Sequence, residues 1–389
     1  MNDNPSIPRI AFITNYVTPY RVTFYQKLCS FDQYEWIVLH GIKKQDDGRP
    51  AFSGKLEFPN QTLEYSEKRF VYFSIKQMPG LLSVLHSYKP NLIILIGMPG
   101  MLSNWIALFW AKQNHAKSIL WHAGWESQPR KSLQYKIKKV ALKIFLNSCD
   151  HVLVYSSKGK KYLCSLGVSE DHITICYNGI EIDYLLDRYD SILSEGAELR
   201  RKYGNKDLPL FLYVGGMSKD KNVSLLLHAF AELQQSRECS LWLVGDGPEL
   251  ESLKRLAEEL KIKNIKFWGR IFEEVDIYFA SCDYFVLPGV GGLALNQALF
   301  WKKPCVVSEA DTTEDDLVID GETGFRFQVN DKDSLLKAMI RCLDLPSLMY
   351  MRFGENGYRL IVERSNVSEM VKVFTHTIEN LLQPSKFTP

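Results

Sequence analysis

Short apolar runs alternate with longer stretches of helical periodicity along most of this chain. In the first half, the apolar runs predict strands at Arg9–Thr14, Trp36–Leu39, Leu92–Ile96, Ser118–Trp121 and His151–Tyr155. The stretches with apolar residues at helical spacing predict helices at Arg21–Cys29, Leu81–Ser87, Asn104–Gln113, Leu133–Asn147 and Lys158–Leu166. Alternation of this kind is typical of a parallel sheet covered by helices on both faces.

The second half of the chain shows the same alternation of predicted strands and helices. Its expected strands are Leu210–Val214, Ser240–Val244, Ile265–Trp268, Tyr284–Leu287 and Cys305–Val307. Its expected helices are Val223–Gln235, Pro248–Leu260, Gly292–Trp301, Asp333–Leu343 and Pro346–Ile361. A chain of 389 residues is long enough for two cores, so we predict two doubly wound, Rossmann-like α/β domains. We place their connection near Ser191–Asp207 and the domains at 1–195 and 196–365, with a helix in 366–389 that packs back toward the first domain.

One uncharged stretch, residues 91–111, has the length of a membrane-spanning helix. The interruption Gly97-Met98-Pro99-Gly100 divides it into a strand, a turn and a helix. We therefore favour a buried strand–helix unit over a membrane span. The N-terminus has no long apolar segment after a basic start, so we expect no signal peptide.

The net charge and the spacing of the cysteines restrict the binding partners and the cellular compartment that we expect. The net charge of +2 implies no overall attraction to nucleic acid. The eight cysteines are scattered and none are at CxxC spacing, which argues against a disulfide framework or a zinc site. We expect a cytoplasmic protein.

The turns that follow the strands are the candidate sites, because open parallel sheets bind ligands beyond the carboxyl ends of their strands. One such turn runs from Gly215 and Gly216 to Lys221. Glycines let backbone N–H groups approach a phosphate, and the lysine would neutralise a diphosphate. The alternative is an ordinary tight turn with a solvated lysine.

A second glycine-rich turn follows the fourth strand of this half. Gly291, Gly292 and Leu293 precede an apolar helix whose first turns hold Asn296 and Gln297. Backbone amides before a helix would bind an anion, and one of the two side-chain amides would bind ribose hydroxyls. The alternative is a glycine-rich loop with a polar start to the helix.

These turns belong to an ordered series of motifs that resembles the retaining family 4 glycosyltransferases, which have the two-domain GT-B fold. The matching segments are Ile175–Glu181, Val214–Asn222, Gly245–Glu249, Phe267–Arg270, Cys282–Pro288, Gly289–Val307 and Asp320–Phe325. Each motif alone is weak, but the series keeps the family's order. Pro288–Ala294 and Asp311–Leu317 are similar to a subgroup with P-G-x-G-G-L-A in place of the glutamate-containing start.

The resemblance implies an acceptor-binding N-terminal domain and a C-terminal domain that binds a UDP- or GDP-sugar. The implied reaction moves the sugar to a glycan or lipid-linked acceptor, in the synthesis of surface polysaccharide or lipopolysaccharide. It also implies that the acceptor hydroxyl attacks the face that the nucleotide leaves, while a donor phosphate oxygen takes the proton. The protein would then position the reactants and neutralise the leaving diphosphate, without a protein nucleophile.

Carried over by position, the resemblance implies that Lys221 binds the donor phosphates and acts in catalysis. It also marks three departures from the family pattern. The neighbouring arginine of the family falls on Gly216, and its two glutamates fall on Gly289 and Gln297. Lys219 or Arg270 would supply the missing positive charge, and Gln297 would bind ribose as a neutral ligand.

The N-terminal half resembles the family less closely. A histidine after the strand Ser118–Trp121 lies beside the donor sugar in the family, so His122 is the catalytic candidate of this half. Tyr20 and Arg21 open the first helix, where the arginine would reach a phosphate, and Glu126 would bind acceptor hydroxyls. The alternatives are a surface arginine, a core or capping histidine, and a carboxylate at a helix start.

One D-x-D sequence, Asp331-Lys332-Asp333, has the pattern that metal-dependent transferases of the other major fold commonly use. It stands just before a predicted helix, where an aspartate caps free backbone amides. We therefore interpret it as a helix cap and expect catalysis without a metal or other cofactor.

A basic amphipathic stretch at 130–145 predicts contact with an anionic membrane surface on the inner leaflet. The basic residues are Arg130, Lys131, Lys136, Lys138, Lys139 and Lys143, with no acid among them, and Lys158, Lys160 and Lys161 follow. The alternative is an ordinary domain helix with its lysines in water.

Two other functional classes remain open from the sequence. One is a different enzyme of the same fold, a nucleotide-sugar epimerase or a sugar phosphorylase. The other is a pseudoenzyme that binds a nucleotide sugar without catalysis, which Gly216, Gly289 and Gln297 favour. Release of UDP or GDP from a sugar donor would distinguish the transferase from the pseudoenzyme.

Overall fold

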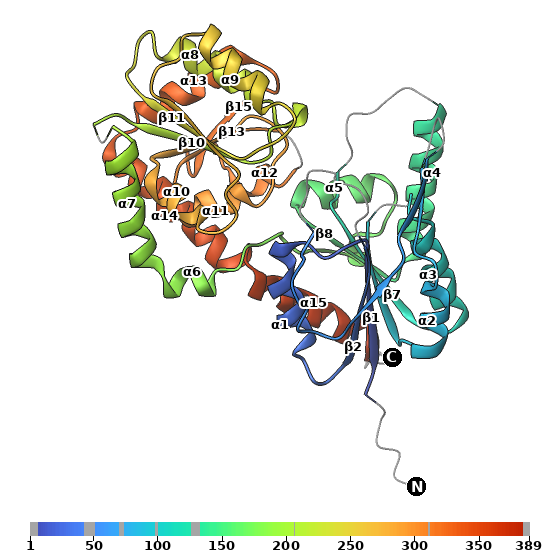
Figure 1. Cartoon of the computed structure of the whole chain (residues 1–389). Helices are drawn as coiled ribbons and strands as arrows, with labels where there is room; N and C mark the ends of the chain where they lie inside the picture. The colour runs from blue at the N-terminus through green and yellow to red at the C-terminus, as the bar shows by residue number, and fades with distance from the viewer. Residues whose placement is uncertain are drawn as a thin grey trace. The chain divides into compact units, whose positions relative to one another are not determined.

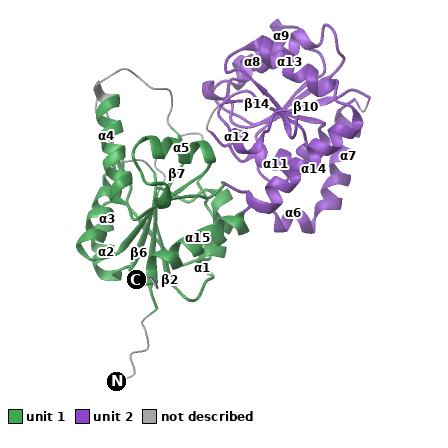
Figure 2. Ribbon diagram, turned by 180° about the vertical axis from the view of Figure 1, so that it is seen from behind, with its two compact units in different colours: residues 1–177, 367–389 green, residues 178–366 purple. Residues whose placement is uncertain are grey.

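The chain forms two compact units in a computed structural model (Figure 1). Unit 1 comprises residues 1–177 and 367–389, and unit 2 comprises residues 178–366 (Figure 2). The structure describes residues 7–42, 51–69, 74–97, 100–125, 133–205, 207–309 and 312–383. Each unit is a parallel sheet with helices on both faces, as the alternating pattern predicted.

The main sheet of unit 1 has the strand order β3-β2-β1-β6-β7-β8-β9 in the described part of the chain. Its strands are β1 (Arg9–Thr14), β2 (Glu35–Gly41), β3 (Asn60–Leu63), β6 (Leu92–Ile96), β7 (Lys117–His122), β8 (His151–Val154) and β9 (Ile173–Ile175). All neighbouring pairs are parallel, and an antiparallel hairpin of β4 (Ser66–Arg69) and β5 (Ser74–Gln77) stands apart from them. The strand order reverses between β1 and β6, where sheets of this type usually bind ligands.

Two groups of helices cover the faces of this sheet. They are η1 (Pro19–Arg21), α1 (Val22–Cys29), α2 (Leu81–Tyr88), α3 (Leu102–Gln113), α4 (Leu133–Ser148), α5 (Ser157–Ser165), η2 (Glu170–His172) and α15 (Val367–Leu382). α1 and α15 share one face, where the Phe374 ring lies 5.1 Å from both Phe24 and Trp121. The last helix of the chain is therefore part of the unit 1 core.

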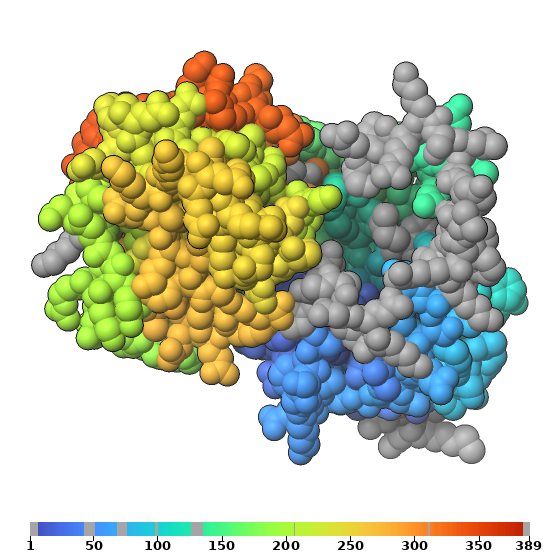
Figure 3. Space-filling view, turned by 45° about the horizontal axis from the view of Figure 1, so that its top comes forward, coloured from blue at the N-terminus to red at the C-terminus, as the bar shows by residue number. Residues whose placement is uncertain are grey.

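Unit 2 has a sheet with the strand order β12-β11-β10-β13-β14-β15. Figure 3 shows one face of its surface, in the green-to-red part of the colour bar. Its strands are β10 (Leu210–Val214), β11 (Ser240–Val244), β12 (Ile265–Gly269), β13 (Tyr284–Leu287), β14 (Cys305–Ser308) and β15 (Gly324–Phe327). Its helices are α6 (Asp183–Asp187), α7 (Tyr189–Tyr203), η3 (Lys219–Lys221), α8 (Val223–Leu233), α9 (Leu250–Glu259), α10 (Val275–Ser281), α11 (Ala294–Phe300), α12 (Glu314–Leu317), α13 (Lys332–Leu343) and α14 (Ser347–Arg364).

The segment near Ser191–Asp207, predicted as the connection, is largely helix α7 of unit 2. A Cβ atom on Gly196 would lie 2.7 Å from the Ala280 side chain of α10, so the two helices pack closely. Arg200 donates to both carboxylate oxygens of Asp283, at 2.7 and 2.8 Å. The unit boundary therefore lies before residue 178 rather than at 195. The polar sequence of α7 suggested a linker because only a narrow side of this helix is buried.

The uncharged stretch at 91–111 forms strand β6 and helix α3, which confirms the strand–helix prediction. Within the described ranges, no helix combines the length and the apolar character that a membrane span requires. The turn residues Met98 and Pro99 lie outside the described residues. All eight cysteines are free thiols.

Candidate functional site

The turns after β10, β11 and β13 are joined through their backbones. The Gly215 N–H donates to the Val244 carbonyl at 3.0 Å, and the Met217 N–H donates to the Asp246 carbonyl at 2.9 Å. A Cβ atom on Gly245, which has a φ of +142°, would lie 1.8 Å from the Gly215 oxygen. A side chain at 245 would therefore separate the turns. We call residues 215–222, 245–249 and 288–293 the glycine cradle.

Lys221 connects the first and third turns of the glycine cradle. Its Nζ donates to the carbonyl oxygens of Val290 and Gly291, at 2.7 and 2.9 Å. A Cβ atom on Gly289 would lie 2.3 Å from the Asp220 oxygen, so glycine is required where these turns meet. The structure thus brings the predicted lysine directly onto the predicted second glycine turn.

The third turn presents donors for an anion. Among the described residues, the backbone N–H groups of Gly291, Gly292 and Leu293 have no hydrogen-bond acceptor. The space beside Gly292 is also unobstructed, because no heavy atom lies within 4 Å of an added Cβ. The helix that follows, α11, has only seven residues, so the loop amides and Lys221, more than a helix dipole, define the positive character of this turn.

Gly216 and Arg270 lie on either side of the second turn. A Cβ atom on Gly216 would meet only the Asp246 carbonyl oxygen, at 4.0 Å, so space exists where the family places its arginine. The Arg270 Nε lies 3.8 Å from an Asp246 carboxylate oxygen, and both side chains are half exposed. Arg270 therefore stands next to the cradle, with part of its charge balanced by Asp246.

Gln297 is held by an aspartate that the sequence analysis did not single out. The Trp301 Nε1 donates to Asp276 at 2.7 Å, and the Gln297 Nε2 lies 3.4 Å from both carboxylate oxygens. Burial raises the pKa of Asp276, and the Trp301 and Gln297 donors oppose that rise. Because the amide nitrogen of Gln297 faces a carboxylate, its Oε1 is the atom left to accept a hydrogen bond from a ligand hydroxyl.

Asn296, the other candidate for binding ribose, has a structural role. Its side chain is 3% exposed, and its Nδ2 donates to the Asn178 carbonyl at 3.0 Å. This bond ties α11 to the start of unit 2. Of the two neighbouring amides, Gln297 is therefore the better placed to contact a ligand.

The Asp276 contact leads to a prediction for Gln297→Glu, which would restore the residue type of the family. The new carboxylate would face Asp276, and adjacent carboxylates cannot both ionise without a large cost. We expect UDP affinity, measured by calorimetry, to fall about 10-fold or more, as a lost buried hydrogen bond to a charged group implies.

The control is the double variant Asp276→Asn with Gln297→Glu. An asparagine at 276 can accept from Trp301 and donate to the new glutamate, so we expect most of the affinity to return. Equal UDP affinity in the wild type and the single variant would contradict the assigned contact.

In unit 1, Arg21 is buried, so the alternative of a surface arginine is wrong. Its guanidinium carbon lies 4.3 Å from the centre of the Trp121 ring and 5.3 Å from that of Tyr20, and the side chain is 7% exposed. Burial raises the pKa of Tyr155 to about 12, and the neighbouring Arg21 charge opposes that rise. A phosphate contact by Arg21 stays a prediction, and Tyr20 is 51% exposed beside it.

His122 ends β7 and is 2% exposed. Its Nδ1 accepts the backbone N–H of Gly124 at 2.9 Å, so a neutral ring carries its proton on Nε2. Gly124, with a φ of +76°, is needed here because a Cβ would lie 2.3 Å from Val154. The turn thus fixes the ring, while Glu126 lies outside the described residues.

The D-x-D sequence is a helix cap, as predicted. The Asp331 carboxylate accepts the backbone N–H of Ser334 at 2.9 Å, at the start of α13. Over the described ranges, no group of three or more His, Cys, Asp and Glu side chains is arranged to hold a metal ion.

Comparison with known proteins matches both halves of the chain to glycosyltransferase families. Residues 196–360 match the group 1 glycosyl transferases, and residues 50–184 match glycosyltransferase family 4. Together the matches span most of the chain in the order of one GT-B enzyme. The chain therefore has the GT-B fold of glycosyltransferases, and each of its halves matches a glycosyltransferase family model.

Individual relatives are distant. A glycosyltransferase of unknown specificity from Methanocaldococcus jannaschii is 27% identical over 263 residues, which cover 66% of this chain and 65% of the relative. The matched segments cover 46 and 51% of two further curated relatives. A glycosyltransferase from Rickettsia africae has a TM-score of 0.76 at 15% identity, covering 98% of this chain and 100% of that one. HepE from Anabaena, solved with UDP, has a TM-score of 0.74 at 15% identity, and the match covers 96% of this chain and 100% of HepE.

Proposed function

We propose that this protein transfers a sugar from a UDP- or GDP-sugar to a glycan or lipid-linked acceptor, with retention of configuration. The observation that carries the proposal is the contact of Lys221 with the Val290–Gly291 turn, which places a cation beside unoccupied loop amides. A site of this kind suits a diphosphate, whose charge grows as the sugar leaves. HepE, which was solved with UDP, shares the fold and supports a nucleotide donor.

In this proposal, unit 2 binds the donor. Lys221 and the amides of residues 291–293 hold the diphosphate, the Gln297 Oε1 accepts from a ribose hydroxyl, and Arg270 adds charge at the second turn. The acceptor hydroxyl loses its proton to a donor phosphate oxygen as it attacks. His122 of unit 1 contacts the donor sugar, and Tyr20, Arg21 and Glu126 contribute to the acceptor side.

The experiment that tests the proposal is a screen of nucleotide sugars by thermal shift, followed by assays of UDP or GDP release. A nucleotide that binds only the folded protein raises its melting temperature. We expect one UDP- or GDP-sugar to stabilise the protein and to be turned over with its anomeric configuration kept. Binding without release of UDP or GDP would instead identify the pseudoenzyme that Gly289 and Gln297 favour. Interconversion of the sugar on the nucleotide would identify an epimerase.

We propose surface polysaccharide or lipopolysaccharide synthesis as the setting. An O-antigen chain mannosyltransferase of Escherichia coli is 26% identical over 179 residues, and a D-rhamnosyltransferase of Pseudomonas aeruginosa is 30% identical over 131 residues. These relatives support a sugar acceptor on a bacterial glycan.

We propose that transfer needs no divalent metal, because Lys221 and the backbone amides of residues 291–293 supply the positive charge that a metal would otherwise supply. Treatment with EDTA followed by gel filtration is expected to leave sugar transfer within about twofold of the untreated rate. Activity that vanishes on EDTA treatment and returns with Mg²⁺ or Mn²⁺ would refute this expectation.

We propose further that helix α4 binds an anionic membrane surface. Its lysines at 136, 138, 139 and 143 are exposed, and Ile137, Val140 and Ile144 are 61, 58 and 53% exposed. α4 therefore exposes both apolar and basic side chains between residues 136 and 144, whereas Phe145 is buried. Arg130 and Lys131 lie outside the described residues.

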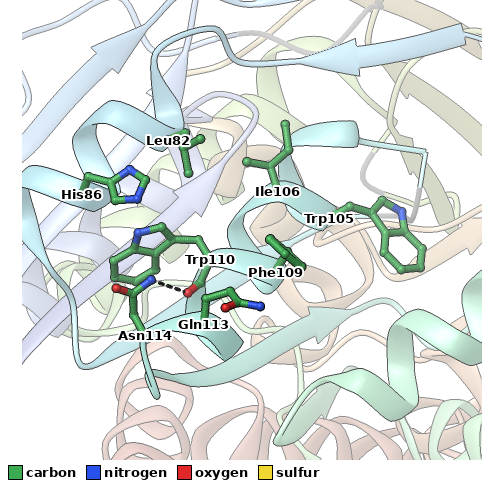
Figure 4. A pocket seen from close by; sticks show the side chains of 8 residues that line it. All are labelled: Leu82, His86, Trp105, Ile106, Phe109, Trp110, Gln113 and Asn114. Carbon is green, nitrogen blue, oxygen red and sulfur yellow. Dashed lines mark hydrogen bonds between the residues drawn. The ribbon is translucent and has the colours of Figure 1, made fainter.

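An apolar groove between α2 and α3 supports a lipid-facing surface in unit 1. Leu82 and His86 of α2 face Ile106 and Phe109 of α3 across it, and Phe109 is 66% exposed (Figure 4). Trp105, at the edge of the groove, contacts the Phe145 ring of α4 at 4.8 Å. Trp105 thus connects the wall of the groove to the buried side of α4.

Liposome cosedimentation tests the membrane proposal. Each basic residue near an anionic surface contributes about 1 kcal/mol, so replacing Lys136, Lys138, Lys139 and Lys143 with glutamine should lower binding to vesicles containing phosphatidylglycerol at least 100-fold. The control carries the same four-charge change on exposed lysines of unit 2, at Lys202, Lys261, Lys263 and Lys337. Equal loss in both variants would exclude a specific role of α4.

A further inference from the structure

Tyr213 links the core of unit 2 to the first turn of the glycine cradle. It is the fourth residue of β10, its side chain is fully buried, and its hydroxyl donates to the Gly216 carbonyl at 2.7 Å. Burial raises the pKa of Tyr213, and the nearby charge of Asp220 raises it further. The phenol therefore keeps its proton at neutral pH and is the donor in this hydrogen bond.

Gly215 provides the space that the tyrosine hydroxyl occupies. A Cβ atom on Gly215 would lie 2.7 Å from the Tyr213 hydroxyl oxygen. A side chain at 215 would therefore displace the hydroxyl from the Gly216 carbonyl. A Cβ atom on Gly216, by contrast, would meet only the Asp246 carbonyl oxygen, at 4.0 Å. The first of the two adjacent glycines thus accommodates Tyr213, and the second leaves the surface of the turn open.

Hydrogen bonds on both sides of Gly216 restrict its backbone. The N–H groups of the two neighbouring residues, Gly215 and Met217, donate to the end of β11 and to the second turn of the cradle. The Gly216 carbonyl accepts from Tyr213. A glycine backbone is otherwise unusually free to rotate. The bond from Tyr213 therefore fixes a turn that two adjacent glycines alone would leave flexible.

The Gly216 N–H is available to a ligand. Gly216 is exposed, and its N–H has no hydrogen-bond acceptor in the part of the chain that the structure describes. The preceding carbonyl, that of Gly215, faces Gly245, where a Cβ atom would lie 1.8 Å from its oxygen. In a planar trans peptide the N–H points away from the carbonyl. The Gly216 N–H therefore points away from the second turn, toward the side of β10 on which β13 leads to the third turn.

A purely structural role would also place a partner beside a buried tyrosine hydroxyl. Two features favour a role in binding. The bond from Tyr213 ends on an exposed residue of the cradle, Gly216, rather than within the core. The residue between them, Gly215, has no side chain that would block the bond. Backbone donors that are held in place before a ligand arrives bind it with a smaller loss of conformational entropy.

We infer that the Gly216 N–H binds the diphosphate of the sugar donor, and that Tyr213 is the positioning residue that orients it. Tyr213 touches no ligand and acts through the Gly216 carbonyl. The inference rests on the proposed function, because it assumes that the glycine cradle binds a nucleoside diphosphate.

Tyr213→Phe tests the inference, because it removes the hydroxyl and keeps the ring. The probes are UDP, GDP and inorganic pyrophosphate, and their affinities are measured by calorimetry. For each probe that binds the wild type, we expect the affinity to fall about 3- to 10-fold, the effect of losing one hydrogen bond.

Glycine-selective ¹⁵N labelling separates positioning from a purely structural role. The Gly216 amide resonance is identified by its absence in Gly216→Ala. In the wild type this resonance should shift when UDP or GDP is added, and at saturation the shift should be at least halved in Tyr213→Phe. A tyrosine that only stabilises the core would lower the melting temperature and leave this response unchanged.

The matched control is Tyr284→Phe. Tyr284 is a buried tyrosine on the neighbouring strand, β13, and its ring lies 5.2 Å from that of Phe211. It is the first residue of its strand, so it lies at the end of the parallel sheet opposite the glycine cradle. Tyr284→Phe should bind the probes as the wild type does.

Gly215→Ala provides a second route to the same loss. Its Cβ would displace the Tyr213 hydroxyl, so this variant should also bind the probes more weakly. The double variant of Gly215→Ala and Tyr213→Phe should be weakened by less than the product of the two single effects, because both act on one bond. Fully multiplicative effects would overturn the assigned contact.

Three further results would overturn the inference. They are an unchanged probe affinity in Tyr213→Phe, equal losses in the Tyr213 and Tyr284 variants, and a Gly216 amide that does not respond to UDP or GDP in the wild type. Sugar transfer is scored separately, by release of UDP or GDP from a sugar donor. A responding Gly216 amide without transfer would keep the inference and refute the proposed transferase. Transfer that is unaffected by Tyr213→Phe would do the reverse.

Discussion

Replacing Lys221 with methionine is expected to lower kcat/KM for the sugar donor by about 100- to 1,000-fold, the usual effect of removing one donor that stabilises developing negative charge. Methionine keeps the length of the side chain but removes the cation beside the Val290–Gly291 turn. It also removes the two bonds that hold this turn. Both losses act on the diphosphate, so UDP affinity should fall together with the rate of sugar transfer.

The matched control for this prediction is Lys219→Met. Lys219 lies in the same 3-10 turn but is exposed, so it tests for a general loss of positive charge. We expect a change of less than about threefold, as screening of exposed charges implies. Similar effects of the two substitutions would show that Lys221 has no specific role.

Gly289→Ala is expected to destabilise unit 2 by about 1–3 kcal/mol, the range for overpacking a tight site. The added Cβ would lie 2.3 Å from the Asp220 oxygen, and this neighbour is backbone, which cannot rotate away. The turns would have to separate, so Lys221 would lose its contacts with Val290 and Gly291. For a unit of this size the melting temperature should fall by roughly 2 to 10 °C.

Gly292→Ala provides the control for this loss of stability, since the same substitution three residues later meets open space. Its melting temperature should stay within about 1 °C of the wild type, the usual result away from packed features. Gly289→Glu should be at least as damaging as Gly289→Ala. If Gly289→Glu were instead stable and more active, a family-like glutamate site would exist at this position.

The sequence predicted the central strands well and the sheet edges poorly. β1, β6, β10, β11 and β13 were predicted with the observed bounds, because buried parallel strands are continuous apolar runs. The edge strands β3, β9 and β15 were missed. These three strands have only three or four residues each, and a segment such as Asn-Gln-Thr-Leu in β3 has no apolar run to detect. The remaining edge strand, β12, was predicted to within one residue.

The candidate site was predictable in part for a similar reason. Glycines and a lysine after a strand are visible locally, which is why Lys221 and the Gly291–Leu293 turn were found. The Asp276–Gln297 contact joins residues from two helices, and no local pattern marks the aspartate.

The return of α15 to unit 1 has a consequence for the order in which the chain can fold during synthesis. Unit 2 is one continuous segment, residues 178–366, so all of it has been synthesised before α15 is made. Unit 1 needs Phe374 to complete its aromatic cluster with Phe12, Phe24 and Trp121. Unit 1 is therefore translated first but can finish folding only after unit 2 has been translated. Until α15 is made, the aromatic face of unit 1 stays exposed, and we expect chaperones to bind it.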